Sequence, residues 1–223
     1  MLHIALTGGI SCGKSLLASF LNELGVEPID ADDVAHELIP DPEERRRLAA
    51  EVFADPEKRR ELESRLHPQI KARIDEFLGE RDSRDGRDER GDSQSLQSRL
   101  SRLSRSSRLS RQSQLLPSSF LLLPSTKLRL AIIPLLFETH WDSEYDIICC
   151  VASTRENQIS RMMTTRGYTR EEAEARLAAQ LPVAEKAAKS HYVIDNNGTE
   201  EDLKEKATEF VTWLKNSTYS QDR

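Results

Sequence analysis

Short apolar segments recur along the chain, and longer stretches with helical periodicity separate them. The apolar segments span residues 2–7, 26–29, 128–133, 145–151 and 192–195. Each is almost continuously apolar, which is typical of strands that are covered on both faces in a parallel sheet. The pattern therefore predicts an α/β fold, with a doubly wound parallel sheet of about five strands flanked by helices.

Helix-start signals mark most of the intervening segments. The dipeptide Asp-Pro at 41–42 and again at 55–56 favours helices over residues 42–53 and 55–78. Thr169 followed by Glu172 has the spacing of a capping box, so a helix is expected from Thr169 to about Gln180. Three more helices are expected to begin near Ser15, Thr154 and Thr199.

Residues 80–127 break this pattern. Arginine recurs at every third position over residues 81–90 and again over 99–111, and Ser-Arg is repeated from Ser98 to Arg111. A strict period of three gives neither a helix nor a strand a steady apolar face, so we predict a disordered low-complexity insertion. The expected organisation is one domain over residues 1–217, interrupted by residues 80–127 and followed by a tail over 218–223.

Two interpretations of this insertion are open. As a basic tract it would bind RNA or be phosphorylated on serine. As a repeat expansion in a surface loop, or as a gene-model error, it would have no role of its own. The second interpretation is favoured because lengthening a surface loop costs little stability.

Composition and charge limit the classes of partner and the cellular location that are expected. The net charge of −6 gives no general attraction to nucleic acid or to an anionic membrane. No apolar run approaches the roughly 20 residues of a membrane span. Because the first strand begins at Leu2, no signal peptide is expected. Three cysteines make no disulfide framework, so a reducing, cytoplasmic location is expected. We expect a monomer or a small homo-oligomer.

Residues Gly8 to Ser15 match the phosphate-binding motif G-x-x-x-x-G-K-[ST]. The predicted strand before the motif and helix after it provide the context that the motif requires. In such a loop, backbone N–H groups and the helix N-terminus hold phosphate oxygens. Lys14 is expected to reach the β and γ phosphates, and the Ser15 hydroxyl to bind Mg²⁺. Cys12 lies near a helix N-terminus, which would favour its thiolate, although a small spacer residue is the favoured interpretation.

Other polar residues have both a chemical and a structural interpretation. Asp30 and Asp32 follow the second strand, where one would serve as a general base and the other would orient metal-bound water, or both would cap a helix. Arg161 and Arg166 would close over phosphates or form an exposed ion-paired face. His67, before Pro68 at a predicted helix junction, is more often a structural hydrogen-bonding residue than a catalyst.

Taken together, these motifs resemble those of the dephospho-CoA kinase family. The chain carries, in the family's order, Thr7-Gly8-Gly9-Ile10, Ile29-Asp30-Ala31-Asp32, His67-Pro68, Pro134-Leu135-Leu136-Phe137-Glu138, Gln158 with Arg161, Ala178-Ala179-Gln180, and Val193-Ile194-Asp195-Asn196-Asn197-Gly198. The resemblance runs from about Leu2 to Leu214, without the insertion. It implies a P-loop NTPase fold with a helical acceptor and lid region. It also implies transfer of the ATP γ-phosphate to the ribose 3′-hydroxyl of dephospho-CoA, the last step of CoA biosynthesis.

The resemblance also implies roles for individual residues. Asp32 is expected to be the catalytic base, Arg161 the lid arginine, and His67 a residue of the acceptor side. The Asn197 turn is expected to approach the nucleotide base. The ATP phosphates are expected at Gly9, Ile10, Ser11, Cys12, Gly13, Lys14, Ser15 and Leu16, together with Mg²⁺.

The chain also departs from the family pattern. The segment between Asp32 and His67 is shorter than is usual in the family. The position of a second lid arginine, four residues after Arg161, is Thr165, and Arg166 follows it. Two alternatives therefore stand beside the kinase of dephospho-CoA. One is another nucleoside or nucleotide kinase, and the other is a catalytically degenerate ATP-binding protein.

Overall fold

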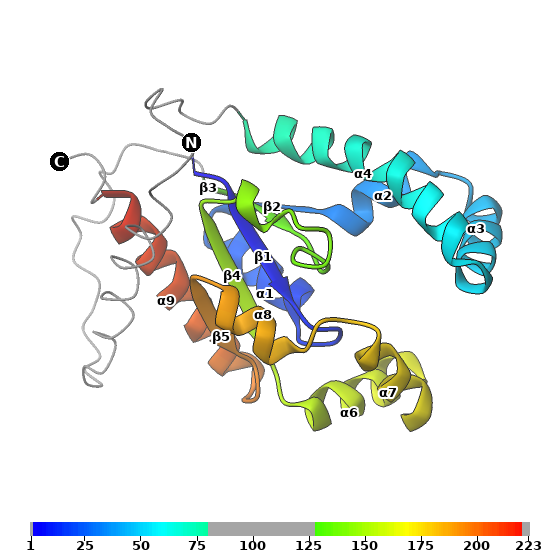
Figure 1. Ribbon diagram of the computed structural model, residues 1–223. Helices are drawn as coiled ribbons and strands as arrows, with labels where there is room; N and C mark the ends of the chain where they lie inside the picture. The colour runs from blue at the N-terminus through cyan, green and yellow to red at the C-terminus, as the bar shows by residue number, and fades with distance from the viewer. Residues whose placement is uncertain (1, 80–127, 220–223) are drawn as a thin grey trace.

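A computed structural model describes residues 2–79 and 128–219 of the chain. Its centre is a five-stranded sheet in the order β2-β3-β1-β4-β5, with every neighbouring pair parallel (Figure 1). The strands are β1 (Ile4–Gly8), β2 (Val26–Asp30), β3 (Leu128–Ile132), β4 (Ile147–Ala152) and β5 (Tyr192–Asp195). The predicted doubly wound α/β fold is therefore confirmed.

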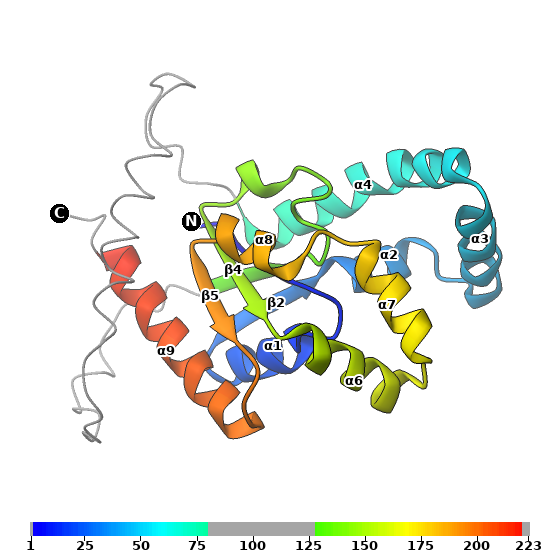
Figure 2. The same ribbon diagram turned by 60° about the horizontal axis from the view of Figure 1, so that its bottom comes forward.

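Helices cover both faces of the sheet. They are α1 (Lys14–Glu23), α2 (Ala31–Leu38), α3 (Pro42–Ala54), α4 (Pro56–Leu78), α6 (Arg155–Arg166), α7 (Arg170–Ala178), α8 (Val183–Lys189) and α9 (Glu200–Tyr219), with a 3-10 turn η2 (Asp142–Glu144) before β4. Figure 2 shows α8 and α4 above the sheet and α1 and α9 below it. Among the described residues, no helix has both the length and the apolar character needed to cross a membrane.

The alternation of side chains along each strand separates two cores. Ile4 and Leu6 of β1 pack with α1 and α9, whereas Ala5 between them packs with α2 and α4. Successive strand residues point to opposite sides of the sheet, and all five residues of β1 are buried. Both faces of β1 are therefore covered. This arrangement explains the continuous apolar runs in the sequence.

Two helical parts project from the layered core. The pair α3 and α4 extends to one side, and the pair α6 and α7 lies below it in Figure 1. The second pair has a small core of its own, formed by Ile159, Met162 and Ala173. Thr154 caps α6, and Thr169 and Glu172 form the predicted capping box of α7.

Several local predictions need correction. Helices α2 and α8 were not predicted, because each has fewer than nine residues. The strand expected over residues 128–133 ends at Ile132. His67 and Pro68 lie inside the continuous helix α4 rather than at a junction. Proline removes one backbone donor there, and the helix continues on either side of it.

The predicted insertion, residues 80–127, lies outside the described residues. The elements on either side of it are in contact. The guanidinium of Arg129 in β3 donates to the carbonyl oxygen of Phe77 at 2.7 Å and lies over the Phe77 ring. The carbonyl oxygen of Gly79, at the end of α4, is 2.9 Å from Nε2 of His3. The end of α4 and the start of β3, on either side of residues 80–127, therefore lie close together.

His191 gives the fold a predictable pH dependence. Its Nδ1 accepts a hydrogen bond from the Ile148 backbone N–H at 2.9 Å, which requires the neutral ring. Burial lowers the pKa of His191, and the charge of Asp146 opposes this effect. Because the unfolded chain then binds a proton that the folded chain does not, stability is complete above about pH 6.5 and falls as the pH drops towards the lowered pKa.

We expect the variant His191→Asn to lose part of this acid sensitivity. Urea unfolding at pH 7.5, 6.5 and 5.5 should show a smaller decrease in the free energy of unfolding than in the parent protein. The two proteins differ only at residue 191, so the comparison isolates His191. An equal decrease in both proteins would assign the acid sensitivity to other groups.

Candidate active site

The polar segments that follow the five strands meet at one edge of the sheet. Because all strands are parallel, their carboxyl ends lie together, where open α/β sheets bind ligands. The segments are the loop 9–13 after β1, Asp30–Asp32 after β2, Pro134–Glu138 after β3, Ser153 and Thr154 after β4, and Asn196 and Asn197 after β5. The topology thus brings together most of the residues predicted from sequence.

The loop between β1 and α1 has the shape that phosphate binding requires. Gly13 has φ 94° and precedes α1, whose first N–H groups have no partners within the helix. Nδ2 of Asn196 donates to the Cys12 carbonyl oxygen at 2.8 Å. A Cβ atom at Gly13 would lie 2.2 Å from this Nδ2, so glycine is needed both for the backbone conformation and for the approach of Asn196.

Lys14 is folded onto its own loop. Its Nζ donates to the carbonyl oxygens of Gly8 at 3.0 Å and Gly9 at 2.9 Å. Burial lowers the pKa of Lys14, and the charge of Lys186 acts in the same direction, whereas Asp32 and Asp30 oppose it. The ammonium group therefore lies in the centre of the site, held by weak acceptors that anionic oxygens would replace.

The expectation of a thiolate at Cys12 is not supported. The side chain is fully buried within the core formed by β1, β4, α1 and α9. Burial raises the pKa of Cys12, and this effect exceeds the opposing influence of the Lys14 charge. Cys12 is thus an apolar packing residue of the loop, in agreement with its interpretation as a small spacer.

The two predicted carboxylates have different environments. Asp30 is the N-cap of α2, and its Oδ1 accepts from the Asp32 backbone N–H at 2.9 Å. Burial raises the pKa of Asp30, and the nearby charges of Asp32 and Asp33 add to this effect. Asp32 lies exposed on the first turn of α2, with its carboxylate near enough to Lys14 to interact with its charge. Asp30 therefore has a structural role, which leaves Asp32 free to react.

Arg161 reaches from α6 to the same edge. Its guanidinium donates to the Asn196 carbonyl oxygen at 2.9 Å and lies 3.5 Å from both the Ser11 carbonyl oxygen and the Ser153 hydroxyl. Its contact with Ser11 places a fixed positive charge beside the phosphate loop. The displaced Arg166 is the last residue of α6, and Thr165 donates to the Arg161 carbonyl oxygen at 2.5 Å.

The Asn197 amide holds the turn after β5. Its Oδ1 accepts from Ser153 Oγ, Thr154 N and Asn157 Nδ2 at 3.0, 2.8 and 3.0 Å. Its Nδ2 donates to Oδ2 of Asp195 at 2.7 Å. In this state the side chain joins β4, β5 and α6, so its first effect is on the shape of the site.

Sequence reasoning missed an ion pair beside this site. Lys186 of α8 is fully buried, and its Nζ lies 2.7 Å from Oε1 of Glu138 and 2.7 Å from the Pro134 carbonyl oxygen. The same Oε1 accepts from the Leu181 backbone N–H at 3.0 Å. The pair therefore fixes the segment after β3 against the segment before α8. Lysine in a short, charged helix gives no sequence signal of burial.

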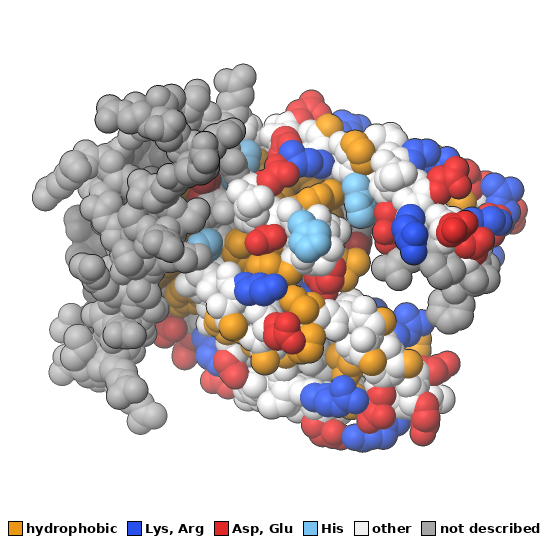
Figure 3. Space-filling view, viewed as in Figure 1, with side chains coloured by type: hydrophobic (Ala, Val, Ile, Leu, Met, Phe, Trp, Pro, Cys, Tyr) orange, Lys and Arg blue, Asp and Glu red, His pale blue; other side chains and the backbone are white. Residues whose placement is uncertain are grey.

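His67, on α4, contacts the chain segment between β3 and β4. Its ring makes an edge-to-face contact with Trp141, with centroids 5.3 Å apart at 74°. Figure 3 shows a gap, open to solvent on this face, between the part formed by α3 and α4 and the part formed by α6 and α7. His67 is a residue of α4, on one side of this gap, and Arg161 is a residue of α6, on the other side, whereas Asp32 lies on α2.

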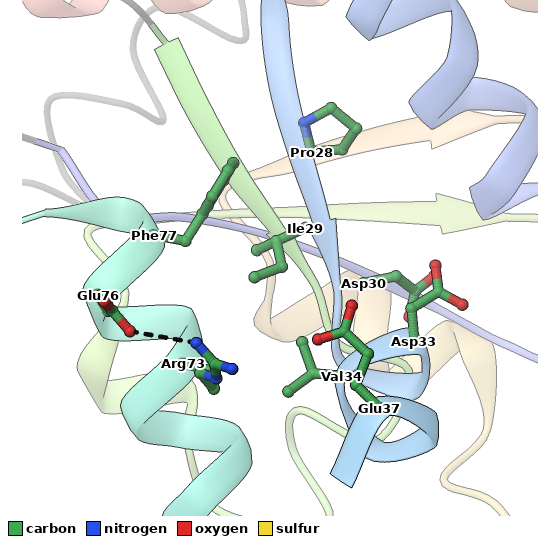
Figure 4. Close-up of a pocket in the computed structure, with 9 residues that line it drawn as sticks. All are labelled: Pro28, Ile29, Asp30, Asp33, Val34, Glu37, Arg73, Glu76 and Phe77. Atoms are coloured by element: carbon green, nitrogen blue, oxygen red, sulfur yellow. Dashed lines mark ion pairs between the residues drawn. The ribbon is translucent and has the colours of Figure 1, made fainter. Parts of the chain in front are cut away.

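A separate cavity of about 500 Å³ lies beside the edge strand β2, between α2 and α4 (Figure 4). Its lining includes four carboxylates, from Asp30, Asp33, Glu37 and Glu76. Arg73 is the single cation among the lining residues, and it pairs with Glu76 at 3.7 Å. Because the lining carries net negative charge, this cavity is unsuited to a polyphosphate ligand.

The donors at the edge fit a magnesium ion that is held mainly by its substrate. Ser15 is exposed on the first turn of α1, and Asp32 is exposed on the first turn of α2. Among residues 2–79 and 128–219, no group of three or more His, Cys, Asp or Glu side chains is placed to hold a metal. Mg²⁺ is commonly bound by one or two protein oxygens together with phosphates and water, and the present residues meet that requirement.

Comparison with known proteins gives a consistent result. The sequence profile of the dephospho-CoA kinase family matches residues 2–44 and 113–202. A dephospho-CoA kinase of Geobacillus kaustophilus is 30% identical over 203 residues, covering 91% of this chain and 92% of the relative. One from Geobacter sulfurreducens is 32% identical over 214 residues, covering 95% and 97%. In fold, the chain is similar to the dephospho-CoA kinase from Campylobacter jejuni, with a TM-score of 0.56, 21% identity, and coverage of 95% and 96%.

Proposed function

The chain belongs to the dephospho-CoA kinase family, whose reaction is the last step of CoA biosynthesis, and we propose that the edge described above is its active site. In this proposal the γ-phosphate of ATP is transferred to the ribose 3′-hydroxyl of dephospho-CoA. The observation that carries the assignment is the convergence of Lys14, Asp32 and Arg161 on one sheet edge. These residues come from three different segments of the chain, on α1, α2 and α6.

The roles follow from charge and position. Asp32 accepts the proton of the 3′-hydroxyl, whose oxygen then attacks the γ-phosphorus as its bond to the β-phosphate oxygen breaks and ADP leaves. Lys14 exchanges the carbonyl oxygens of Gly8 and Gly9 for β- and γ-phosphate oxygens. Arg161 turns from the Ser11 and Asn196 carbonyl oxygens to the transferring group. Both cations then stabilise charge that grows in the transition state.

Mg²⁺, when bound, neutralises charge on the β- and γ-phosphate oxygens. The Ser15 hydroxyl is its expected protein ligand. The phosphates themselves are expected at residues 9–16, in the loop and the first turn of α1. The Asn197 turn is expected to lie beside the nucleotide base, with the Asn197 side chain keeping its present bonds.

The acceptor is expected in the gap between the two helical parts, where His67 and Trp141 form part of the wall. A ligand with a diphosphate group is not expected in the acidic cavity beside β2. The shortened segment between Asp32 and His67 forms α2, α3 and the first half of α4, so a helical wall is retained.

The decisive test is ADP release from Mg-ATP by the purified protein, with and without dephospho-CoA. Release that requires dephospho-CoA, with CoA identified by mass spectrometry, would establish the activity. A panel of nucleosides and nucleotides distinguishes the first alternative, since turnover with one of them and none with dephospho-CoA would indicate a different kinase. ATP binding without turnover on any acceptor would indicate a degenerate ATP-binding protein.

The contact between Phe77 and Arg129 predicts that the domain does not need residues 81–113 for its stability or for ATP binding. Deletion of residues 81–113 should leave both thermal stability and ATP affinity unchanged, because the elements on either side already meet. Calorimetric titration with ATP and a thermal unfolding curve would measure both properties. Loss of ATP binding in a folded deletion protein would show instead that these residues serve the site, and salt-sensitive RNA binding lost with them would give them a separate role.

A further inference from the structure

The backbone N–H and the backbone carbonyl oxygen of Ile10 are each bonded to a glutamine side chain. Nε2 of Gln158, in α6, donates to the Ile10 carbonyl oxygen at 2.7 Å. Oε1 of Gln180, two residues after α7, accepts from the Ile10 N–H at 3.2 Å. Ile10 lies in the loop between β1 and α1, where neither element supplies partners for its backbone groups. Both backbone hydrogen-bonding groups of Ile10, one from each of the two peptide units that it joins, are therefore satisfied by residues 158 and 180 of the α6–α7 segment.

The Ile10 side chain makes the same connection through apolar contacts. It packs against the small core of Ile159, Met162 and Ala173 that α6 and α7 share. This core is separate from the two cores on either side of the sheet. Ile10 thus belongs to the phosphate loop by sequence and to the helical pair by packing.

The neighbouring glycine supports this arrangement. Gln158 is 3% exposed, and a Cβ atom built on Gly9 would lie 2.5 Å from its Nε2. Side-chain atoms do not approach a Cβ atom this closely, so the amide reaches Ile10 only because residue 9 is glycine. Gly9 therefore has a reason to be glycine that is independent of phosphate.

Helices α6 and α7 act on the loop as one unit. Arg170 at the start of α7 pairs with Glu156 of α6 at 2.9 Å and with Glu174 at 3.3 Å. Gln158 lies in α6 and Gln180 follows α7, so the two paired helices together hold the N–H and the carbonyl oxygen of Ile10.

We propose that Gln158 and Gln180 are positioning residues. They hold the backbone N–H and carbonyl groups of Ile10 so that the phosphate loop is preorganised for the triphosphate of ATP. The proposal rests on the assignment of this loop as the ATP site and not on the identity of the acceptor. Without either bond the loop would be ordered only when the nucleotide binds, which would weaken ATP binding. The KM for dephospho-CoA should not change.

The two glutamines have opposite hydrogen-bonding roles, which allows a matched test. Gln158 uses its amide as a donor, and Gln180 uses its amide as an acceptor. The variants Gln158→Glu and Gln180→Glu each add one negative charge beside the backbone of Ile10. Only Gln180→Glu keeps a hydrogen-bond acceptor for the Ile10 N–H, whereas Gln158→Glu loses the donor to the Ile10 carbonyl oxygen. A third variant, Gln180→Met, keeps the length of the side chain and removes the acceptor without adding charge.

The dissociation constant for Mg-ATP is measured by calorimetry, which needs no acceptor, and apo stability is measured by thermal unfolding. We expect Gln158→Glu to bind ATP about 10-fold more weakly than Gln180→Glu, and Gln180→Met to bind about 10-fold more weakly than the parent protein. Equal affinities in the two glutamate variants, or parent affinity in Gln180→Met, would overturn the proposal. A lowered apo melting temperature with unchanged ATP affinity would also overturn it, because the residues would then serve stability alone. If Gln158→Glu does not fold, Gln180→Met and Gln180→Glu decide the question.

Discussion

The substitution Asp32→Asn is expected to lower kcat by about 10²–10⁴-fold, the usual contribution of a general base. Asparagine keeps the size of the side chain and its place on the first turn of α2, but it cannot accept the proton of the 3′-hydroxyl. Asp32 is exposed on α2, outside the phosphate loop, so ATP affinity should change little. Steady-state kinetics together with calorimetric ATP titration would separate the two effects.

Asp33→Asn is the matched control for this experiment. Asp33 is the next residue of the same helical turn, but it lines the cavity beside β2 (Figure 4). The control changes the net charge by the same amount at nearly the same place, and its kcat should remain close to that of the parent protein. An unchanged kcat in Asp32→Asn, or an equal loss in both variants, would remove Asp32 from the role of base.

The substitution Lys14→Ala is expected to lower turnover by at least about 10³-fold, in line with other cations that stabilise a transferring phosphoryl group. It removes the ammonium group in the centre of the site, and ATP affinity should fall as well because Lys14 is expected to contact the ground-state phosphates. The hydrogen bonds of Lys14 within residues 2–79 and 128–219 go to carbonyl oxygens of its own loop, so the fold should survive its loss. Kinetics at saturating ATP, with circular dichroism as a check on folding, would measure the effect.

Lys204→Ala provides a comparison of equal charge change. Lys204 lies on α9 in an exposed ion pair with Glu23, on the face of the sheet covered by α1 and α9. Exposed pairs of this kind contribute about 0–1 kcal/mol, so both stability and turnover should be nearly unchanged. Normal turnover in Lys14→Ala would contradict the assignment of the phosphate loop.

Much of the fold was predictable because its signals are local. The strand of residues 4–8, the glycine loop and the helix from Lys14 are contiguous, so the motif and its context are visible in one window of sequence. The caps at Thr154 and Thr169 depend on residues only three positions apart. Helices α2 and α8 were missed because short helices owe their stability to packing rather than to their own propensity.

The candidate site was predictable only in part, and the reason is again one of distance along the chain. Asp32, Lys14 and Arg161 could be proposed from motif order, but Lys186 could not, since a lysine becomes buried only when Glu138 is brought to it. The favoured interpretation of Cys12 as a small spacer agrees with its burial. The alternative of a thiolate does not, because the helix terminus is visible in the sequence and the surrounding core is not.

The five strands, most of the helices, the phosphate loop and the chemical types of the residues that follow the strands could be predicted from the sequence, because they depend on backbone preferences and on apolar periodicity over a few residues. The bonds from Gln158 and Gln180 to the Ile10 backbone could be found only in the folded structure, since they join residues 148 and 170 positions apart. Contacts of this kind arise from how the helices pack across the end of the sheet, and no local pattern of side chains encodes them.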